Sequence, residues 1–352
     1  MFKFQDVQHD TPDEYATPTD SARVLGDMQK AVALNEEFKQ QGYEVGGDRN
    51  PGLGHILSVA PGVAAWKTSA EVSPSLALDP FYMPTPGLMS SIYEVDAETR
   101  AWLANKPLCV ALRARAKIEQ EIYLSKADEP NWLIVAAGRG RYPLLTATKV
   151  ARQLGQGPML DMVDIDPMAL HQIKGLTYDC SYQKVSLIDR DILDLKGFRR
   201  QRWIARLLRR LATGKWPLDT PQEIKLNHYG VVSGIGISMY IKDSAWALKL
   251  SKKVLGRDSV QKSGVVELYR SMWRHVKPGG IMLVDAINQG GPGDDINLQL
   301  DTIQTIGWRP MYQRSPEQVL ALAEQAGIDA ARVERHTVSN GFFSLYVFHK
   351  KP

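Results

Sequence analysis

The fold of this chain is decided by residues 132–145, which read WLIVAAGRGRYPLL. An apolar run leads into two glycines, Gly138 and Gly140, and an apolar helical pattern from Leu144 to Leu154 comes directly after them. A buried strand, a tight turn and a helix in this order place free backbone N–H groups and a helix N-terminus at one point, which suits a polar or anionic small molecule. Strand–glycine–helix turns are common, so this interpretation needs support from the strands further along the chain.

A second strand supports it. Residues 159–164, MLDMVD, end in Asp164, and Pro167 then suits the first turn of a helix. Asp164 comes about 25 residues after the glycines, where a doubly wound nucleotide site places the carboxylate that accepts from ribose hydroxyls. Further strands are expected at residues 185–189, 229–233, 281–285, 331–339 and 342–349. The last two are closely spaced, which predicts an antiparallel pair.

These elements together resemble the class I S-adenosylmethionine-dependent methyltransferases from about residue 127 to 351. The resemblance rests on the glycine turn, the acid after the second strand, Asp191-Ile192 after the third and KPGG (277–280) before the fifth. The segments AAGRGRY (136–142) and VVSG (231–234) look like a methyltransferase domain that is sometimes fused to α/β-hydrolases. The resemblance implies an α/β fold with a doubly wound, seven-stranded, mostly parallel Rossmann-like sheet whose last strand is antiparallel.

The same resemblance implies that S-adenosyl-L-methionine is the cofactor or the substrate. The two glycines would line its methionine part, Asp164 would hold the ribose, and Asp191 with Ile192 would contact the adenine. The full set of cofactor contacts expected in this way is Ala137, Gly138, Arg139, Gly140, Asp164, Ile165, Asp191, Ile192, Ser233 and Gly234.

The glycine motif departs from the family pattern at one position. The acidic residue that usually opens it is Ala136 here, while Arg139 and Arg141 place positive charge beside the turn. These arginines either contact the cofactor's carboxylate or are solvated loop residues. A nicotinamide dehydrogenase is disfavoured, because its third glycine is replaced by Pro143, which has no N–H.

Three regions are expected along the chain. Residues 1–18 are polar and predict a flexible arm, residues 19–126 a helical, Pro-rich lid or cap, and residues 127–352 the S-adenosylmethionine-binding catalytic domain. A basic amphipathic insertion at 196–220 could lie on a membrane or on nucleic acid, but docking on the core or on a second subunit is favoured. Within the lid, Arg113 and Arg115 either reach a carboxylate in the site or lie on a solvated helix face, with the solvated face favoured.

Methyl transfer from a sulfonium requires chiefly alignment of a nucleophile and exclusion of water. Candidate catalytic residues at strand ends and nearby are Ser233, Asp285, Tyr142, Tyr178, Tyr182 and Asn227. No histidine has the context of a general base, and no metal site is expected. The favoured function is methyl transfer to a small-molecule nucleophile. The alternatives are non-methylating consumption of S-adenosylmethionine (cyclisation to azetidine-2-carboxylate with methylthioadenosine, or aminocarboxypropyl transfer) and a non-catalytic cofactor-binding subunit.

Composition agrees with a small-molecule biosynthetic transferase. The 352 residues are 44% hydrophobic and 23% charged, with a net charge of +4 that requires no nucleic-acid partner. Two cysteines, Cys109 and Cys180, indicate neither a disulfide nor a zinc framework. No leader pattern and no apolar run of about 18 residues is seen, so a cytoplasmic protein without a membrane partner is expected. A homodimer is left open.

Overall fold

The computed structural model describes residues 3–9, 18–46, 49–72, 96–138, 140–189, 224–241, 264–290, 295–306 and 310–352. Its strands form one sheet and are β1 (Lys3–Gln8), β2 (Asn131–Val135), β3 (Met159–Asp164), β4 (Val185–Asp189), β5 (Tyr229–Gly234), β6 (Val276–Asn288), β7 (Gln313–Arg314), β8 (Arg332–Thr337) and β9 (Phe343–His349). The strand order is β1-β8-β9-β6-β5-β2-β3-β4, and β7 pairs with β6. The central pairs are parallel, whereas β9 runs antiparallel to both β6 and β8.

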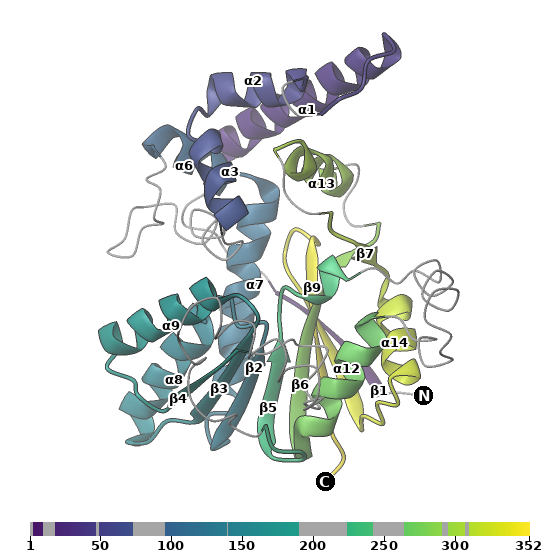
Figure 1. The fold of residues 1–352 in the computed structure, drawn as a ribbon. Coiled ribbons are helices and arrows are strands. Elements are labelled where there is room, and N and C mark those ends of the chain that lie inside the picture. Colours follow the sequence, from purple (N-terminus) through teal and green to yellow (C-terminus); the bar gives the residue numbers. More distant parts are fainter. Residues whose placement is uncertain are drawn as a thin grey trace, which may run out of the picture.

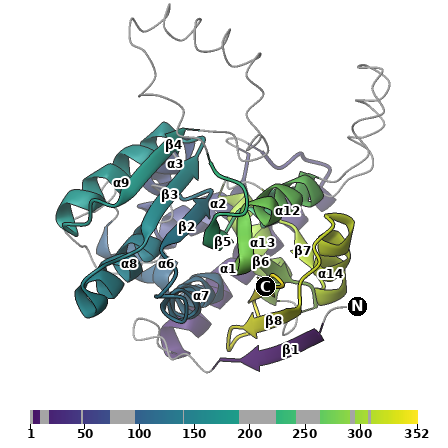
Figure 2. The ribbon, with the colours of Figure 1, turned by 90° about the horizontal axis from the view of Figure 1, so that it is seen from below.

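The expected doubly wound, mostly parallel sheet with an antiparallel last strand is therefore confirmed. Two strands extend the seven that were expected. β7 adds two residues beside β6, and β1 pairs in parallel with β8 at the far edge. Residues 3–8 are consequently a strand and not part of a loose arm, as Figure 2 shows from below.

Helices cover both faces of the sheet. The described ones are α1 (Pro18–Gln40), α2 (Pro51–Val59), α3 (Val63–Val72), α6 (Ala97–Ala104), α7 (Pro107–Leu124), α8 (Arg141–Leu154), α9 (Pro167–Asp179), α12 (Gly264–His275), α13 (Asp295–Thr305), α14 (Pro316–Gln325) and the 3-10 turn η2 (Ser238–Tyr240). One hydrophobic cluster joins α7, α8 and α9 to one face, and a second joins α12 and α14 to the other. This layering is the doubly wound arrangement.

Local sequence signals explain where the helices begin and end. Gly140 and Gly155, both in the left-handed conformation, flank α8. Asp166 caps α9 ahead of Pro167, and a capping box formed by Ser315 and Gln318 opens α14. On α12, apolar residues spaced three and four apart are buried against the sheet, namely Val265, Leu268, Tyr269, Met272 and Trp273.

The helices before α7 gather at one end of the molecule, next to α13, and α7 runs from them to the sheet (Figure 1). Since α13 comes after β6 in the chain, this end is the carboxyl end of the parallel strands. Asn35 of α1 donates to Thr305 of α13 (3.4 Å), and Asn50 donates to the carbonyl of the same threonine (3.2 Å). Buried residues of α1 to α3 belong to the same hydrophobic cluster as the α7 face of the sheet. The lid assignment stays a prediction, but these helices share the hydrophobic core that lies on the α7 face of the sheet.

Candidate functional site

The glycine loop after β2 has an unusual backbone. Ala136, Gly138 and Gly140 have φ angles of 53°, 51° and 58°, so alternate residues are left-handed. A Cβ on Gly140 would lie 2.9 Å from the Ile173 side chain, which shows that the loop approaches α9 closely. A Cβ on Gly138 would meet nothing within 4 Å. The loop is therefore anchored at Gly140 and open at Gly138.

Asp164, at the end of β3, is bound to this loop. Its Oδ2 accepts from the Gly138 N–H at 2.8 Å and its Oδ1 from the Asp166 N–H at 2.9 Å, while only 8% of the residue is exposed. Burial raises the pKa of the carboxyl, and the two backbone N–H groups oppose that rise. The next residue, Ile165, is 60% exposed. Each carboxylate oxygen keeps a lone pair for a further donor, and an exposed apolar side chain lies beside it.

A second set of polar side chains lies at the ends of β5 and β6, facing α7. Asp285 is fully buried, and its Oδ2 forms an ion pair with Arg115 of α7 at 2.5 Å. Its Oδ1 accepts from the Gly236 N–H at 2.8 Å. Arg115 also lies over the ring of Phe343, 5.0 Å from its centroid. Asp285 thus holds α7 and the loop after β5 together.

A separate hydrogen-bonded chain of side chains begins one turn further along α7. The hydroxyl of Tyr123 lies 2.7 Å from Oε1 of Glu119 and 2.9 Å from Oγ of Ser233, and all three residues are buried. The Tyr123 ring stacks on Trp132 of β2, with centroids 5.2 Å apart. Burial raises the pKa of Glu119 to about 7, against the opposing effects of Arg115 and Tyr123. Burial also raises the pKa of Tyr123.

The structure brings most predicted cofactor contacts to one place. Ala137, Gly138 and Gly140 come after β2, Asp164 and Ile165 end the neighbouring β3, and β5 on the other side of β2 ends in Ser233 and Gly234. Tyr142 is half-buried in the first turn of α8, beside the loop. Arg139, Asp191, Ile192 and the basic insertion 196–220 lie outside the described residues.

Three predicted catalytic residues lie away from this place. Tyr178 is 70% exposed near the end of α9, and the Tyr182 hydroxyl donates to the Pro158 carbonyl beside the start of β3. Asn227 precedes β5, where its N–H donates to the Arg274 carbonyl at 2.9 Å. Because a crossover helix returns the chain to the amino ends of the strands, these residues are at the opposite edge of the sheet. These three residues therefore lie apart from the other predicted site residues, and a catalytic role for them stays a prediction.

Residue type alone did not reveal Glu119 and Tyr123. Arg115, Glu119 and Tyr123 follow one another at intervals of four residues, which places all three on one face of α7. The prediction that Arg113 and Arg115 lie on a solvated helix face was wrong, because both side chains are buried. Arg113 donates to the Ala104 carbonyl at 2.7 Å, while Arg115 reaches a carboxylate.

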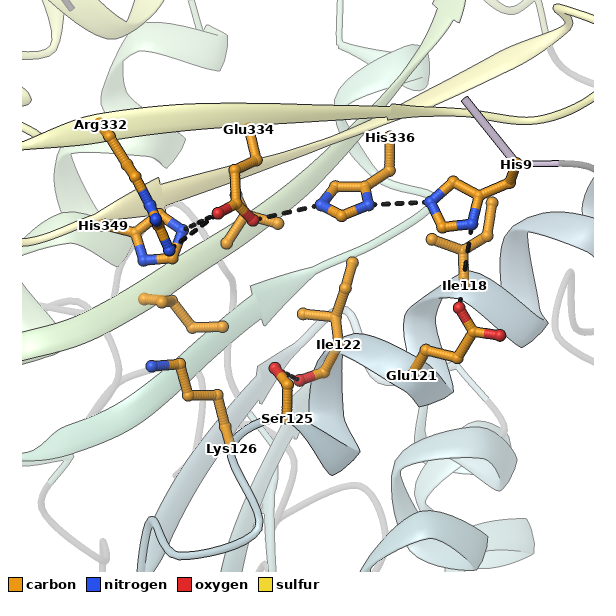
Figure 3. A pocket seen from close by; sticks show the side chains of 12 residues that line it. His9, Ile118, Glu121, Ile122, Ser125, Lys126, Arg332, Glu334, His336 and His349 are labelled. Atoms are coloured by element: carbon orange, nitrogen blue, oxygen red, sulfur yellow. Dashed lines mark hydrogen bonds and ion pairs between the residues drawn. The ribbon is translucent and has the colours of Figure 1, made fainter. Parts of the chain in front are cut away.

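A separate cavity of about 410 Å³ lies between α7 and the β8–β9 edge (Figure 3). Its polar side chains form a row in which Glu334 bridges His349 and His336 at 3.3 Å each, and His336 meets His9 at 2.9 Å. Within the described parts of the chain, no group of three or more His, Cys, Asp or Glu residues is arranged to hold a metal. This row ties the residue after β1 to β8.

Comparisons with known proteins agree with the fold. No model of a known protein family and no curated protein matches the chain. The structure is similar to a possible exported protein from Bordetella parapertussis, with 17% identity, a TM-score of 0.57, and coverage of 98% of this chain and 100% of that chain. An O-methyltransferase family protein from Burkholderia thailandensis has 12% identity, a TM-score of 0.45, and coverage of 92% and 84%. Human N-acetylserotonin methyltransferase has 14% identity and a TM-score of 0.41, with coverage of 94% of this chain and 68% of that chain.

At these identities the likeness is one of fold. The observed strand order β4-β3-β2-β5-β6-β9-β8, with β9 antiparallel, agrees with the doubly wound sheet that the resemblance to the class I S-adenosylmethionine-dependent methyltransferases implies. In the parts of the chain that the structure describes, no helix is long and apolar enough to cross a membrane.

Proposed function

We propose that the protein is an S-adenosylmethionine-dependent methyltransferase that acts on a small-molecule nucleophile beneath the lid helices α1, α2, α3 and α6. The observation that carries this proposal is the junction of the glycine loop with Asp164. An open, left-handed Gly138, a buried carboxylate with spare lone pairs and an exposed Ile165 meet at the carboxyl ends of β2 and β3. Ligands of open α/β sheets bind at this edge.

The residues at the carboxyl ends of β2 and β3 fit S-adenosylmethionine. Asp164 would accept from the ribose hydroxyls, Ile165 would cover an apolar ring face, and the loop at Gly138 leaves room for the methionine part. When bound, S-adenosylmethionine supplies an activated methyl group. The chain supplies alignment, because the ion pair of Asp285 with Arg115 and its bond to Gly236 keep the loop after β5 in place. The lid helices would exclude water.

Calorimetric titration with S-adenosylmethionine tests the cofactor site. Asp164→Asn should weaken binding about 10- to 100-fold, since charge-assisted hydrogen bonds contribute about 1.5–3 kcal/mol each. Asp161→Asn is the matched control on the same strand, because Asp161 accepts from the Tyr229 hydroxyl instead. Equal affinities of the two variants would remove Asp164 from the site.

Mass spectrometry tests the reaction. The protein is incubated with S-adenosylmethionine alone, and then with phenol, benzylamine and a simple thiol as probe acceptors. A methylated probe with S-adenosylhomocysteine supports methyl transfer. Methylthioadenosine formed without any acceptor would overturn methyl transfer in favour of intramolecular chemistry or transfer of the aminocarboxypropyl arm. Binding of the cofactor with no conversion of it or of any probe would count against these probe classes as acceptors.

A further inference from the structure

The hydroxyl of Tyr123 has two polar neighbours but only one proton. When Glu119 is a carboxylate, Tyr123 donates to it and Ser233 donates to Tyr123. When Glu119 is protonated, the directions reverse, so that Glu119 donates to Tyr123 and Tyr123 donates to Ser233. Both arrangements satisfy the observed distances of 2.7 Å and 2.9 Å. A chain with two fully bonded proton arrangements can pass a proton from one end to the other.

The surroundings allow Glu119 to change protonation state. Among charged groups, Arg115 from the same helix favours its ionised form, while Asp285 from β6 disfavours that form. Arg115 is already neutralised by its 2.5 Å ion pair with Asp285. Burial therefore dominates and places the pKa of Glu119 at about 7. A carboxyl with this pKa can accept a proton and release it again near neutral pH.

Ser233, the other end of the hydrogen-bonded chain, lies near the carboxyl end of β5. Ser233 is the next-to-last residue of β5 and pairs with Ile134 of β2. Residues 235–237, which follow the strand, are half-buried. Gly234 faces the opposite side, because a Cβ there would meet Met272 of α12. Ser233 therefore faces α7, in the same layer as Asp285 and Arg115.

We propose that Ser233, Tyr123 and Glu119 form a proton relay that serves the proposed methyl transfer, with Glu119 as the final proton acceptor. The acceptor's O–H proton would pass to Oγ of Ser233 as the acceptor oxygen takes the methyl group, whose bond to the sulfonium sulfur breaks and leaves a neutral thioether. The serine proton moves to Tyr123, and the tyrosine proton moves to Oε1 of Glu119. Nothing in the chain is oxidised or reduced, and Glu119 returns its proton to solvent after turnover. Glu119 and Tyr123 are positioning residues that act through Ser233.

The relay also indicates the acceptor class. A neutral amine can attack before it loses a proton, whereas a hydroxyl must lose its proton as the new bond forms. A buried base connected to the carboxyl end of β5 is therefore useful to a hydroxyl acceptor. This inference rests on the proposed methyl transfer.

Infrared spectroscopy tests the coupling without turnover. Spectra of the full chain between about pH 5 and about pH 9 should show a protonated carboxyl band that titrates near pH 7 and is missing in Glu119→Gln. Ser233→Ala should raise the midpoint by roughly half a unit, and Tyr123→Phe should raise it further, because each removes a bond that supports the carboxylate. Ser344→Ala is the control, because Ser344 is a buried serine of β9 that is hydrogen-bonded to Thr337 of β8. A midpoint that neither Ser233→Ala nor Tyr123→Phe moves would overturn the relay.

Turnover of the probe acceptors separates the relay from the proposed function. With phenol at pH 8, Glu119→Gln should lower kcat about 100-fold and abolish its pH dependence, while the affinity for S-adenosylmethionine stays unchanged. Equal kcat in the variant and the wild type would refute the relay but leave methyl transfer standing. Methylation of benzylamine alone would refute the acceptor class. If the wild type fails to bind S-adenosylmethionine, the proposed function itself fails, whatever the infrared result.

Discussion

A buried Glu119 with a raised pKa should make the protein less stable as the pH rises. The folded state holds this proton more tightly than the unfolded chain, whose pKa is about 4.5, and releases it only near pH 7. The stability that the protonated form contributes is fully present below pH 4.5 and is lost as the pH rises to about 7. At about 1.4 kcal/mol per pKa unit, the loss is about 3 kcal/mol above pH 7.

Glu119→Gln isolates this effect, because glutamine has nearly the same shape and stays neutral. Urea unfolding of both proteins at a series of pH values gives the difference in their free energies of unfolding. Between pH 4.5 and 7 the free energy of unfolding of the variant should rise relative to that of the wild type. The rise should total about 3 kcal/mol, and the difference should then level off. Other titrating groups cancel because they are common to both proteins. A difference that stays flat over this interval would show that Glu119 is ionised normally.

Three further predictions concern the loop and the sheet edge. Ala136→Gly should raise the unfolding midpoint by an amount equivalent to about 1 kcal/mol, because alanine is strained at a φ of 53°; a lower midpoint would contradict this. Gly140→Ala should destabilise by about 1–3 kcal/mol, since its Cβ would lie 2.9 Å from Ile173, and an unchanged midpoint in the same unfolding scan would count against the close approach. Burial lowers the pKa of His336 below 6.5. Burial alone would raise the pKa of Glu334, but His349 and the other cationic neighbours hold that pKa below 4.5. Both groups therefore contribute stability that is lost as the pH falls through these lowered values. Amide exchange of β1 should accelerate below pH 6.5 beyond its intrinsic rate in the wild type but not in His336→Gln.

The central part of the fold could be predicted because its signals are local. The apolar run 132–135, the glycines that flank α8 and the acid that ends β3 each act within a few residues. β1 gave no such signal. Its side chains are mostly exposed, and it is a strand only because β8 offers it a partner.

The candidate site could likewise be predicted only where local sequence signals place its residues. The placement of Asp164 and Gly138 could be inferred from their positions after strands, which the chain order determines. Tyr182 and Asn227 were suggested by residue type, and only the direction of the crossovers shows that they lie at the amino ends. The link between Tyr123 and Ser233 joins residues 110 positions apart, and no local pattern predicts it.

The pairing of β1 with β8 also has a consequence for how the protein is made. Its closing contact, His9 to His336, joins residues 327 positions apart, so the first strand leaves the ribosome long before its partner exists. At about 5–20 residues per second, the wait is roughly 15 to 65 s. During synthesis residues 3–8 have no strand partner, and the β8–β9 hairpin can admit them only once β9 has been translated. Docking of β1 therefore reports that β8 and β9 are both in place.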